Sequence, residues 1–352
     1  MRKKISFPNF IFVLFLICAV LLSGCGLSAH DENEEPAQAP DEKLITIGFS
    51  QVGAESDWRK ANTESMMHTF SRENGYELIY EDAQQKQQNQ ITAVRTFIQR
   101  EVNYIVLAPV TEDGWDTVLE EAKDAGIPVI LVDRQVAVKD DSLFTCWIGS
   151  DFELEADKAC AWLEEFCRMK RISPDDIYIA DIQGTIGSSA QIGRSRGLKK
   201  AASKNGWHLV DEVPGEYTQA KGREATERLL QKYEDLNVIY CENDNEAFGA
   251  IEAIEAAGKK AGRNLRAGEI MVISFDGVSS LAIDDLRNGS IACIGECNPL
   301  HGPRVRELIE SLENGKTPDK YRYVEEDIFS AFEDLTEINV DGISYPVKII
   351  GK

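Results

Sequence analysis

The chain is short of basic residues, and this shortage narrows the choice of partners. Its 352 residues contain 38 Lys and Arg against 60 Asp and Glu, a formal net charge of −22. Without residues 1–25, which hold three basic groups and no acidic one, 35 basic residues face 60 acidic ones, a net charge of −25. A surface of that sign repels nucleic acid and anionic lipid. We therefore expect neither as a direct partner.

Motifs for catalysis and for metal or nucleotide binding are equally scarce. The four histidines stand in no HExxH motif and no nucleophile elbow. Residues 184–189 read GTIGSS, which lacks both GxGxxG and the lysine of a P-loop. We expect no enzymatic activity, no cofactor and no metal. Counting carboxylates does not exclude a glycosidase pair, so an exported α/β enzyme stays as an alternative.

The cysteines show no CxxC pair and no zinc-ligand spacing. Six remain after residues 1–25: Cys146, Cys160, Cys167, Cys241, Cys293 and Cys297. Cys160 and Cys167 would lie roughly 10 Å apart on a helix, too far for a disulfide. Cys293 and Cys297 are also too far apart if the backbone there is extended. We expect mostly buried free thiols, with any long-range bridge undetermined.

The longest apolar run, from about Phe10 to Leu22, is too short to span a membrane comfortably. A basic start precedes it and the small residues Ser23 and Gly24 follow it, the pattern of a secretory signal. The Leu22-Ser23-Gly24-Cys25 ending resembles the lipobox of bacterial lipoproteins. That resemblance implies a signal peptide over 1–24 and a diacylglycerol on Cys25. The alternative is an uncleaved membrane anchor with a chance cysteine.

Residues 26–42 are rich in Ser, Ala, Pro, Glu and Asp and hold too little apolar surface to fold. We therefore expect 25–43 to be a lipidated cysteine followed by a flexible stalk. The predicted location is the extracytoplasmic face of the cell membrane, with membrane contact through the lipid only.

After the stalk, short apolar runs alternate with helical patterns. The runs include 44–49, 104–108, 129–132, 177–182, 238–241 and 270–275. Continuous apolar runs are typical of parallel strands buried on both faces. The periodic segments between them include 58–74, 89–100, 115–125, 153–169, 189–204 and 245–257. Repeated strand–helix units predict a doubly wound α/β fold, and about 310 residues suffice for two domains.

Polar residues follow nearly every predicted strand, where ligands bind in such sheets. Asp133 and Arg134 come directly after 129–132 and together supply the acceptors and donors that a sugar hydroxyl needs. The plain alternative is an ion pair that closes the strand. Asn243 and Asp244 open the helix 245–257, and one of them, which we expect to be Asp244, serves as its N-cap. Asn243 would then be left for a ligand.

Other candidates lie at helix starts and in loops. Trp58 and Arg59 begin the first helix and offer a stacking face and a planar donor, although Trp58 could be a core residue. Arg194 comes early in the helix 189–204 and would clamp a ligand, unless it is a solvated helix arginine. Tyr217 follows Gly215-Glu216 in a loop as a second platform, or simply packs there.

Motifs in order along residues 44 to 330 resemble the periplasmic sugar-binding proteins of ABC importers, of the ribose and galactose type. They include IGFSQVG at 47–53, SxWR at 56–59, QQKQQNQI at 84–91, APV at 108–110 and VDR at 132–134. QGTIG at 183–187, ND at 243–244, FDG at 275–277 and ExNP at 296–299 follow. The nearest subgroup is that of the galactofuranose-binding proteins.

The resemblance implies two Rossmann-like lobes joined by a three-stranded hinge, with an N-terminal lobe of 44–148 and 297–326. The C-terminal lobe would hold 149–296 and 327–352. The implied ligand residues are Ser56, Trp58, Arg59, Asp133, Arg134, Arg194, Tyr217, Asn243, Asp276 and Glu296. The implied function is capture of a monosaccharide by a monomer that delivers it to ABC permease subunits. A protein that presents its ligand to a membrane receptor kinase would use the same pocket.

Overall fold

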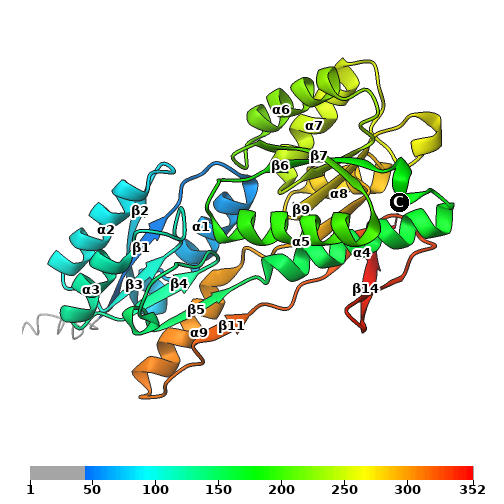
Figure 1. Ribbon diagram of the computed structural model, residues 1–352. Helices are drawn as coiled ribbons and strands as arrows, with labels where there is room; N and C mark the ends of the chain where they lie inside the picture. Colours follow the sequence, from blue (N-terminus) through cyan, green and yellow to red (C-terminus); the bar gives the residue numbers. More distant parts are fainter. Residues whose placement is uncertain (1–43, 352) are drawn as a thin grey trace, which may run out of the picture. The chain divides into compact units, whose positions relative to one another are not determined.

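The computed structural model describes residues 44–351, so the predicted signal peptide, Cys25 and the stalk lie outside the described residues. The described chain forms two lobes, each built on a mostly parallel β-sheet with helices packed against it (Figure 1). The predicted architecture of two α/β lobes is confirmed. None of the helices within 44–351 is long and apolar enough to cross a membrane.

The first sheet is entirely parallel, in the order β11-β5-β4-β3-β1-β2. Its central strands are fully buried, as their continuous apolar sequences predict. The strands are β1 (Ile45–Gln51), β2 (Tyr76–Asp82), β3 (Tyr104–Leu107), β4 (Val129–Val132), β5 (Cys146–Gly149) and β11 (Tyr321–Tyr323). The helices are α1 (Asp57–Thr69), α2 (Gln87–Gln99), α3 (Asp116–Asp124) and α9 (His301–Glu313), with α9 packed on α1.

The second sheet has the order β13-β14-β12-β10-β9-β8-β6-β7. Its strands are β6 (Tyr178–Gln183), β7 (His208–Pro214), β8 (Val238–Cys241), β9 (Met271–Asp276), β10 (Cys293–Glu296), β12 (Ile328–Ser330), β13 (Glu337–Val340) and β14 (Ile343–Ile349). Its helices are α4 (Phe152–Lys170), α5 (Ser189–Asn205), α6 (Gln219–Lys232), α7 (Asp244–Ala256) and α8 (Ser280–Asn288). Short 3₁₀ turns cover Arg72–Asn74, Asp141–Leu143, Pro174–Asp176 and Leu265–Ala267.

The chain after Ser330 adds a hairpin to this second sheet. Strands β13 and β14 are antiparallel and joined by Asp341-Gly342, both with positive φ (48° and 88°). An Asp-Gly pair in that conformation forms the tight turn that matches the twist of a hairpin. Strand β14 then pairs in parallel with β12, which is itself antiparallel to β10. The C-terminal segment therefore extends the sheet of the second lobe.

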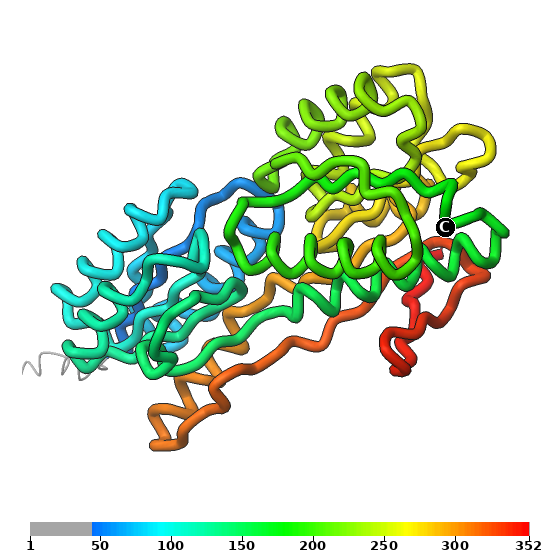
Figure 2. The backbone as a smooth tube through the Cα atoms, in the orientation of Figure 1, coloured from blue at the N-terminus to red at the C-terminus, as the bar shows by residue number. Residues whose placement is uncertain are grey.

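The chain passes between the two sheets three times, as the tube in Figure 2 shows. The first crossover is 150–151, between β5 and α4. The second is 297–300, between β10 and α9, and the third is 324–327, between β11 and β12. These three crossovers are the hinge that joins the lobes.

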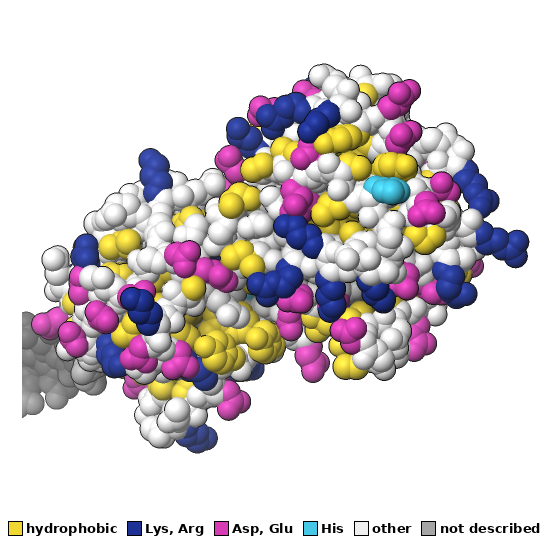
Figure 3. All heavy atoms as spheres, in the orientation of Figure 1, with side chains coloured by type: hydrophobic (Ala, Val, Ile, Leu, Met, Phe, Trp, Pro, Cys, Tyr) yellow, Lys and Arg dark blue, Asp and Glu magenta, His cyan; other side chains and the backbone are white. Residues whose placement is uncertain are grey.

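Buried apolar side chains fill both faces of each sheet, in two large clusters per lobe. The six cysteines within 44–351 are all buried and free, which confirms the expectation of unpaired thiols. Acidic side chains are spread over both lobes on the face seen in Figure 3, with basic ones among them. The negative charge is thus a general property of that face and not a single patch.

Candidate functional site

A small enclosed pocket lies between the lobes, beside the hinge and at the carboxyl ends of the central strands. The structure brings nine of the ten predicted ligand residues to its lining: Ser56, Trp58, Arg59, Asp133, Arg134, Arg194, Tyr217, Asn243 and Asp276. Glu55, Phe152, Ala190 and Cys297 complete it. Residues from many separate parts of the sequence, between Glu55 and Cys297, therefore meet at one place.

The first lobe contributes a compact set of charges. Arg59, on the first turn of α1, lies 2.6 Å from Asp133 at the end of β4 and 3.2 Å from Glu55. Arg134 lies 4.0 Å from Glu55 and donates to the carbonyl oxygen of Val110 at 2.9 Å. These four side chains are at most 4% exposed. Two guanidinium groups and two carboxylates thus neutralise each other within this lobe.

Three pocket residues have backbone angles that L-amino acids seldom adopt. The φ angles of Asp133, Tyr217 and Asp276 are 66°, 60° and 96°. Positive φ in a residue other than glycine is uncommon, and such strain gathers at functional sites where the surrounding fold enforces it. At Asp133 and Asp276 the strained residue ends or follows a buried strand, so its carboxylate turns into the pocket. The same conformation at two equivalent strand ends supports a shared binding role.

The second lobe holds its side of the pocket through Arg194 on α5. The Arg194 guanidinium lies 2.9 Å from Glu155 and 3.3 Å from Asp276, and it also donates to the carbonyl oxygen of Glu242. Burial raises the pKa of Asp276 well above its usual range, while Arg194 acts in the opposite direction. No other ion pair within residues 44–351 involves Glu155 or Asp276. One cation therefore serves two buried carboxyl groups here.

Tyr217 offers a hydroxyl and an aromatic face to the pocket. Its ring fits against Gly184, where a Cβ atom would come within 1.8 Å of the ring, and the Arg134 guanidinium lies 5.2 Å from its centroid. The hydroxyl is buried without a hydrogen-bond partner among the described residues. Burial raises the pKa of this hydroxyl well above its usual range, so it stays protonated and available as a donor.

The expectation about the α7 cap is wrong. Asn243, and not Asp244, is the N-cap: its Oδ1 accepts from the backbone N–H of Glu246 at 2.8 Å, and its Nδ2 donates to the Tyr217 carbonyl oxygen at 3.2 Å. Asp244 instead accepts from the Ser274 hydroxyl at 2.7 Å and from the Gly277 backbone at 2.8 Å. Asn243 has an extended backbone, which is the geometry that an N-cap requires. Asn243 still lines the pocket while it caps the helix.

Trp58 joins the pocket to the hinge. Its indole N–H donates to the carbonyl oxygen of Cys297 at 2.8 Å, and its ring lies 4.6 Å from the Arg59 guanidinium and 5.9 Å from the ring of His301. Ser56 caps α1 by accepting from the backbone N–H of Arg59 at 3.2 Å. These contacts hold the start of α1 against the second crossover.

The structure does not bring Glu296 into the pocket lining. Its carboxylate accepts from the backbone N–H of Asp327 at 2.9 Å and from Asn298 at 3.4 Å, which ties the second crossover to the third. Among the residues that sequence reasoning missed, Glu55 had a usable signal, since it lies four residues before Arg59. Phe152, which has Arg194 5.5 Å from its ring, reads like an ordinary core position of a helix.

Hydrogen bonds join the two lobes at the rim of the pocket. The backbone N–H of Asp57 donates to Asn245 at 2.9 Å, and that of Gln135 donates to the Ser189 hydroxyl at 2.9 Å. The backbone N–H of Glu112 donates to the Gly187 carbonyl oxygen at 2.9 Å. The lobes are therefore closed on each other. Donors and acceptors from both lobes face a space shielded from water, with their charges already balanced, which suits a small neutral polar molecule.

Two α/β lobes that close over a polar pocket, joined by three crossovers, define a two-lobed solute-binding protein. The family model for the periplasmic binding protein domain matches residues 47–295, and this chain belongs to that family.

Among curated proteins, the galactofuranose-binding protein YtfQ of Escherichia coli is 36% identical over 285 residues, 78% of this chain and 85% of the relative. A Mycobacterium smegmatis structure in complex with β-D-fucofuranose is 36% identical, with a TM-score of 0.77 over 82% of this chain and 92% of that one. The arabinose-binding component of an ABC transporter from Shewanella sp. ANA-3, bound to α- and β-L-arabinofuranose, is 37% identical. Its TM-score is 0.73, over 81% of this chain and 91% of that one.

Proposed function

We propose that this chain captures a monosaccharide in a furanose form and delivers it to the permease of a carbohydrate ABC importer. The observation that carries the proposal is the pocket itself, in which both lobes place hydroxyl-binding groups around one enclosed space. The relatives support the choice of ligand, because the three described above, 36–37% identical to this chain, bind furanoses or are named for one. Both faces of the pocket come from one chain, so a monomer suffices.

The donors and acceptors of the pocket match what sugar hydroxyls need. A hydroxyl donates one hydrogen bond and accepts others, so it is best bound between a carboxylate and a fixed N–H donor. Asp133 with Arg134 supplies that combination from the first lobe, and Asp276 with Arg194 supplies it from the second. Asn243 and the Tyr217 hydroxyl add neutral groups that discriminate between hydroxyl positions.

Capture works by a shift between open and closed forms. A sugar that touches both lobes makes all of its contacts only when they are closed, so binding favours closure. The rim contacts of Asp57 with Asn245 and of Gln135 with Ser189 complete the closed form. The closed rim then provides the surface that a permease recognises.

Thermal unfolding in the presence of a sugar panel tests the ligand. L-Arabinose, D-fucose, D-galactose and galactofuranosides should raise the Tm more than ribose or fructose does. A sugar at 100 times its Kd adds about 2.7 kcal/mol of stability. A panel in which no sugar shifts the Tm would contradict the proposed function, and chemical conversion of a sugar during incubation would revive the enzyme hypothesis.

We also propose that Cys25 carries a lipid which holds the protein on the extracytoplasmic face of the membrane. Several acyl chains, each adding on the order of 0.8 kcal/mol per buried CH₂, make a firm anchor. The Cys25→Ala protein should leave the membrane fraction.

Uptake of the labelled sugar, compared between cells with and without this chain, distinguishes import from sensing. A sensor would change gene expression and leave uptake by the existing permease intact.

A further inference from the structure

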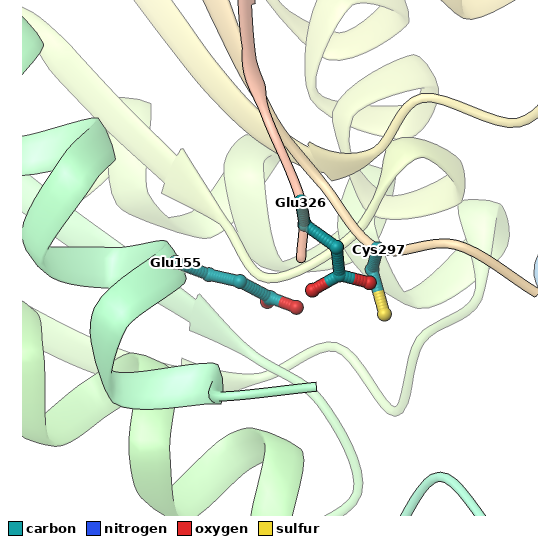
Figure 4. Close-up of side chains that lie close together, drawn as sticks. All are labelled: Glu155, Cys297 and Glu326. Carbon is teal, nitrogen blue, oxygen red and sulfur yellow. The ribbon is translucent and has the colours of Figure 1, made fainter. Parts of the chain in front are cut away.

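Each of the three crossovers brings one polar side chain to the same point beside the pocket. Glu155 lies on the first turn of α4, just after the first crossover, Cys297 begins the second, and Glu326 lies in the third. In Figure 4 the Glu326 carboxyl group lies between the Glu155 carboxyl group and the Cys297 thiol. One oxygen or sulfur atom of each lies within 4.8 Å of the others. The hinge therefore contains a cluster of two carboxyl groups and a thiol.

Several atoms of the cluster have hydrogen-bond partners, and one fully buried oxygen has none. Glu326 Oε1 accepts from the Ser150 hydroxyl at 2.8 Å and from the backbone N–H of Asn298 at 2.7 Å, so it ties all three crossovers together. Glu155 Oε2 accepts from Arg194 at 2.9 Å. Glu155 Oε1 is buried and has no hydrogen-bond partner among the described residues. Glu155 Oε1 therefore lacks a donor, and the Glu326 carboxyl group lies beside the Glu155 carboxyl group (Figure 4).

The charges around the cluster do not supply that donor. Two carboxylates this close, Glu155 buried and Glu326 partly buried, cannot both be ionised at low cost, so one of them holds a proton. Arg194 bonds to Glu155 and not to Glu326. Lys158 bonds to the Glu326 backbone oxygen, and its Nζ lies 2.6 Å from that atom. The remaining ionisable groups that face the cluster are Asp276, Glu296, Cys297 and Arg304.

We propose that Glu155 and Glu326 share one proton, carried on Glu326, and that this shared proton positions Arg194 in the closed pocket. The protonated Glu326 donates to Glu155 Oε1, which leaves Glu155 negative and able to hold Arg194. Loss of the proton puts two negative charges against each other where the crossovers meet, and their repulsion favours the open form. Glu155 and Glu326 are thus positioning residues that act on the ligand through Arg194.

The electrostatics of Glu326 agree with this arrangement and set the sign of the pH effect. Burial, followed by the neighbouring Glu155, raises the pKa of Glu326 from 4.5 to about 10. Between pH 4.5 and about 10, Glu326 holds a proton in the closed form, whereas an exposed carboxyl group has released it. Closure therefore takes up a proton, and the closed form becomes less stable as the pH rises. Burial also raises the pKa of the Cys297 thiol, which keeps it neutral. A surface groove lined by Glu155, Glu326 and Lys158 lets the proton exchange with solvent.

The first experiment needs no ligand. At about pH 8 the infrared difference spectrum, wild type minus Glu326→Gln, should contain one C=O stretch of a buried carboxylic acid, because other buried carboxyl groups such as Asp276 contribute equally to both proteins. The wild-type unfolding constant should also rise with pH by up to about tenfold per unit more than that of Glu326→Gln. Glu325→Gln, an exposed neighbour on the same crossover, is the matched control and should behave like the wild type. Identical spectra and identical pH slopes in wild type and Glu326→Gln would overturn the shared proton.

The second experiment rests on the proposed function and uses L-arabinose as the probe. Calorimetry in buffers of different ionisation heat should show up to one proton taken up per sugar by the wild type and none by Glu326→Gln. Glu155→Gln should weaken binding about tenfold or more, because Arg194 loses its ionised partner. If L-arabinose binds with equal proton uptake to wild type and Glu326→Gln, the positioning role is wrong. If it does not bind at all, the proposed ligand fails, while the infrared and unfolding results still decide on the proton.

A metal ion is the competing occupant of the same three groups. Titration of Zn²⁺ into the wild type should leave its Tm unchanged, because Arg194 already neutralises Glu155. A one-to-one complex that raises the Tm of the wild type and not that of Glu326→Gln would overturn the shared proton in favour of a metal ion.

Discussion

The two faces of the pocket balance their charges in different ways. In the first lobe, Arg59 and Arg134 share Asp133 and Glu55, so each carboxylate retains a cation if one arginine is lost. In the second lobe, Arg194 alone serves Glu155 and Asp276 among the ion pairs within 44–351. The first face is self-contained, because its four groups all come from the loops and the first helical turn of its own lobe. The second face depends on the hinge, because Glu155 contacts the crossovers as well as Arg194.

This difference indicates how each face of the pocket responds when the hinge moves. A redundant charge network would keep its geometry if the lobes separated, so on the proposed function we expect the first face to bind the sugar first. A face held by a single guanidinium changes when the hinge changes. We therefore propose that the ligand first contacts the first lobe and that the second lobe responds to closure.

The largest expected effect comes from removing one arginine from each face of the pocket. Arg194→Ala leaves Glu155 and Asp276 buried and unpaired, and it should lower the free energy of unfolding by about 3–5 kcal/mol. Arg59→Ala leaves Arg134 near both carboxylates and should cost about 1–3 kcal/mol. Urea unfolding at neutral pH measures both values. Equal losses for the two variants would remove the proposed asymmetry.

A second prediction compares a charged pocket residue, Asp133, with a neutral one, Asn243. Asp133→Ala should weaken binding of L-arabinose by about 2–4 kcal/mol. The substitution leaves buried hydroxyl groups of the sugar without an acceptor, and it leaves Arg59 and Arg134 with one carboxylate fewer. Asn243→Ala should cost about 1–2 kcal/mol, part of it through loss of the α7 cap. Calorimetry gives both affinities, with the exposed Asp124→Ala as control. Unchanged affinity in both pocket variants would eliminate this pocket as the sugar site.

A third prediction disturbs only the second face. Gly184→Ala would place a methyl group 1.8 Å from the ring of Tyr217, which is buried and cannot swing away cheaply. Overpacking of this kind costs about 1–3 kcal/mol, and here it should appear as weaker sugar binding together with lower stability. Gly206→Ala, at a site with no neighbour in reach, is a control for stability only, since its φ of 77° adds backbone strain. Normal affinity in Gly184→Ala would show that Tyr217 does not contact the sugar.

The last prediction is a pH dependence in the first lobe, which is small near neutral pH and grows only in acid. Burial lowers the pKa of His301, at the start of α9, from 6.5 to about 3. The unfolded chain therefore binds a proton below pH 6.5 that the folded chain refuses, so stability falls as the pH drops through this window. His301→Gln should remove a slope of about 1.4 kcal/mol per pH unit there, which parallel urea titrations of the two proteins measure. The shared proton at Glu326 predicts the opposite slope, a loss of stability as the pH rises above 4.5. Measurements on His301→Gln and Glu326→Gln therefore distinguish the contribution of the first lobe from that of the hinge.

The fold was largely predictable because its central strands carry strong local signals. Strands β4 and β8 have the limits that their apolar runs predict, since a strand buried on both faces must be apolar throughout. Strands β2 and β7 escaped notice because they lie at sheet edges and are only half-buried, so polar residues interrupt their sequences. The tail after Ser330 carried no usable signal because its two strands, β13 and β14, depend on a sheet built earlier in the chain.

The pocket lining was predictable where it follows from strand ends. Asp133 and Asp276 directly follow predicted strands and Asn243 comes two residues after one, and parallel strands bring their carboxyl ends to one edge. Phe152 and Cys297 have no such position. Asn243 was expected to leave capping to Asp244, and the exchange of roles depends on the side chain of Ser274, which is distant in the sequence.

The sequence by itself determined the two α/β lobes and the strand ends that carry the pocket, because apolar runs and their polar boundaries are local properties of the chain. Only the tertiary structure decided which carboxylate serves which arginine, because such pairs form between residues far apart in the chain. The same holds for the hinge cluster, in which Glu155, Cys297 and Glu326 meet only where the three crossovers pack together. Burial at that point, and not residue type, makes two ordinary glutamates into a proton-sharing pair.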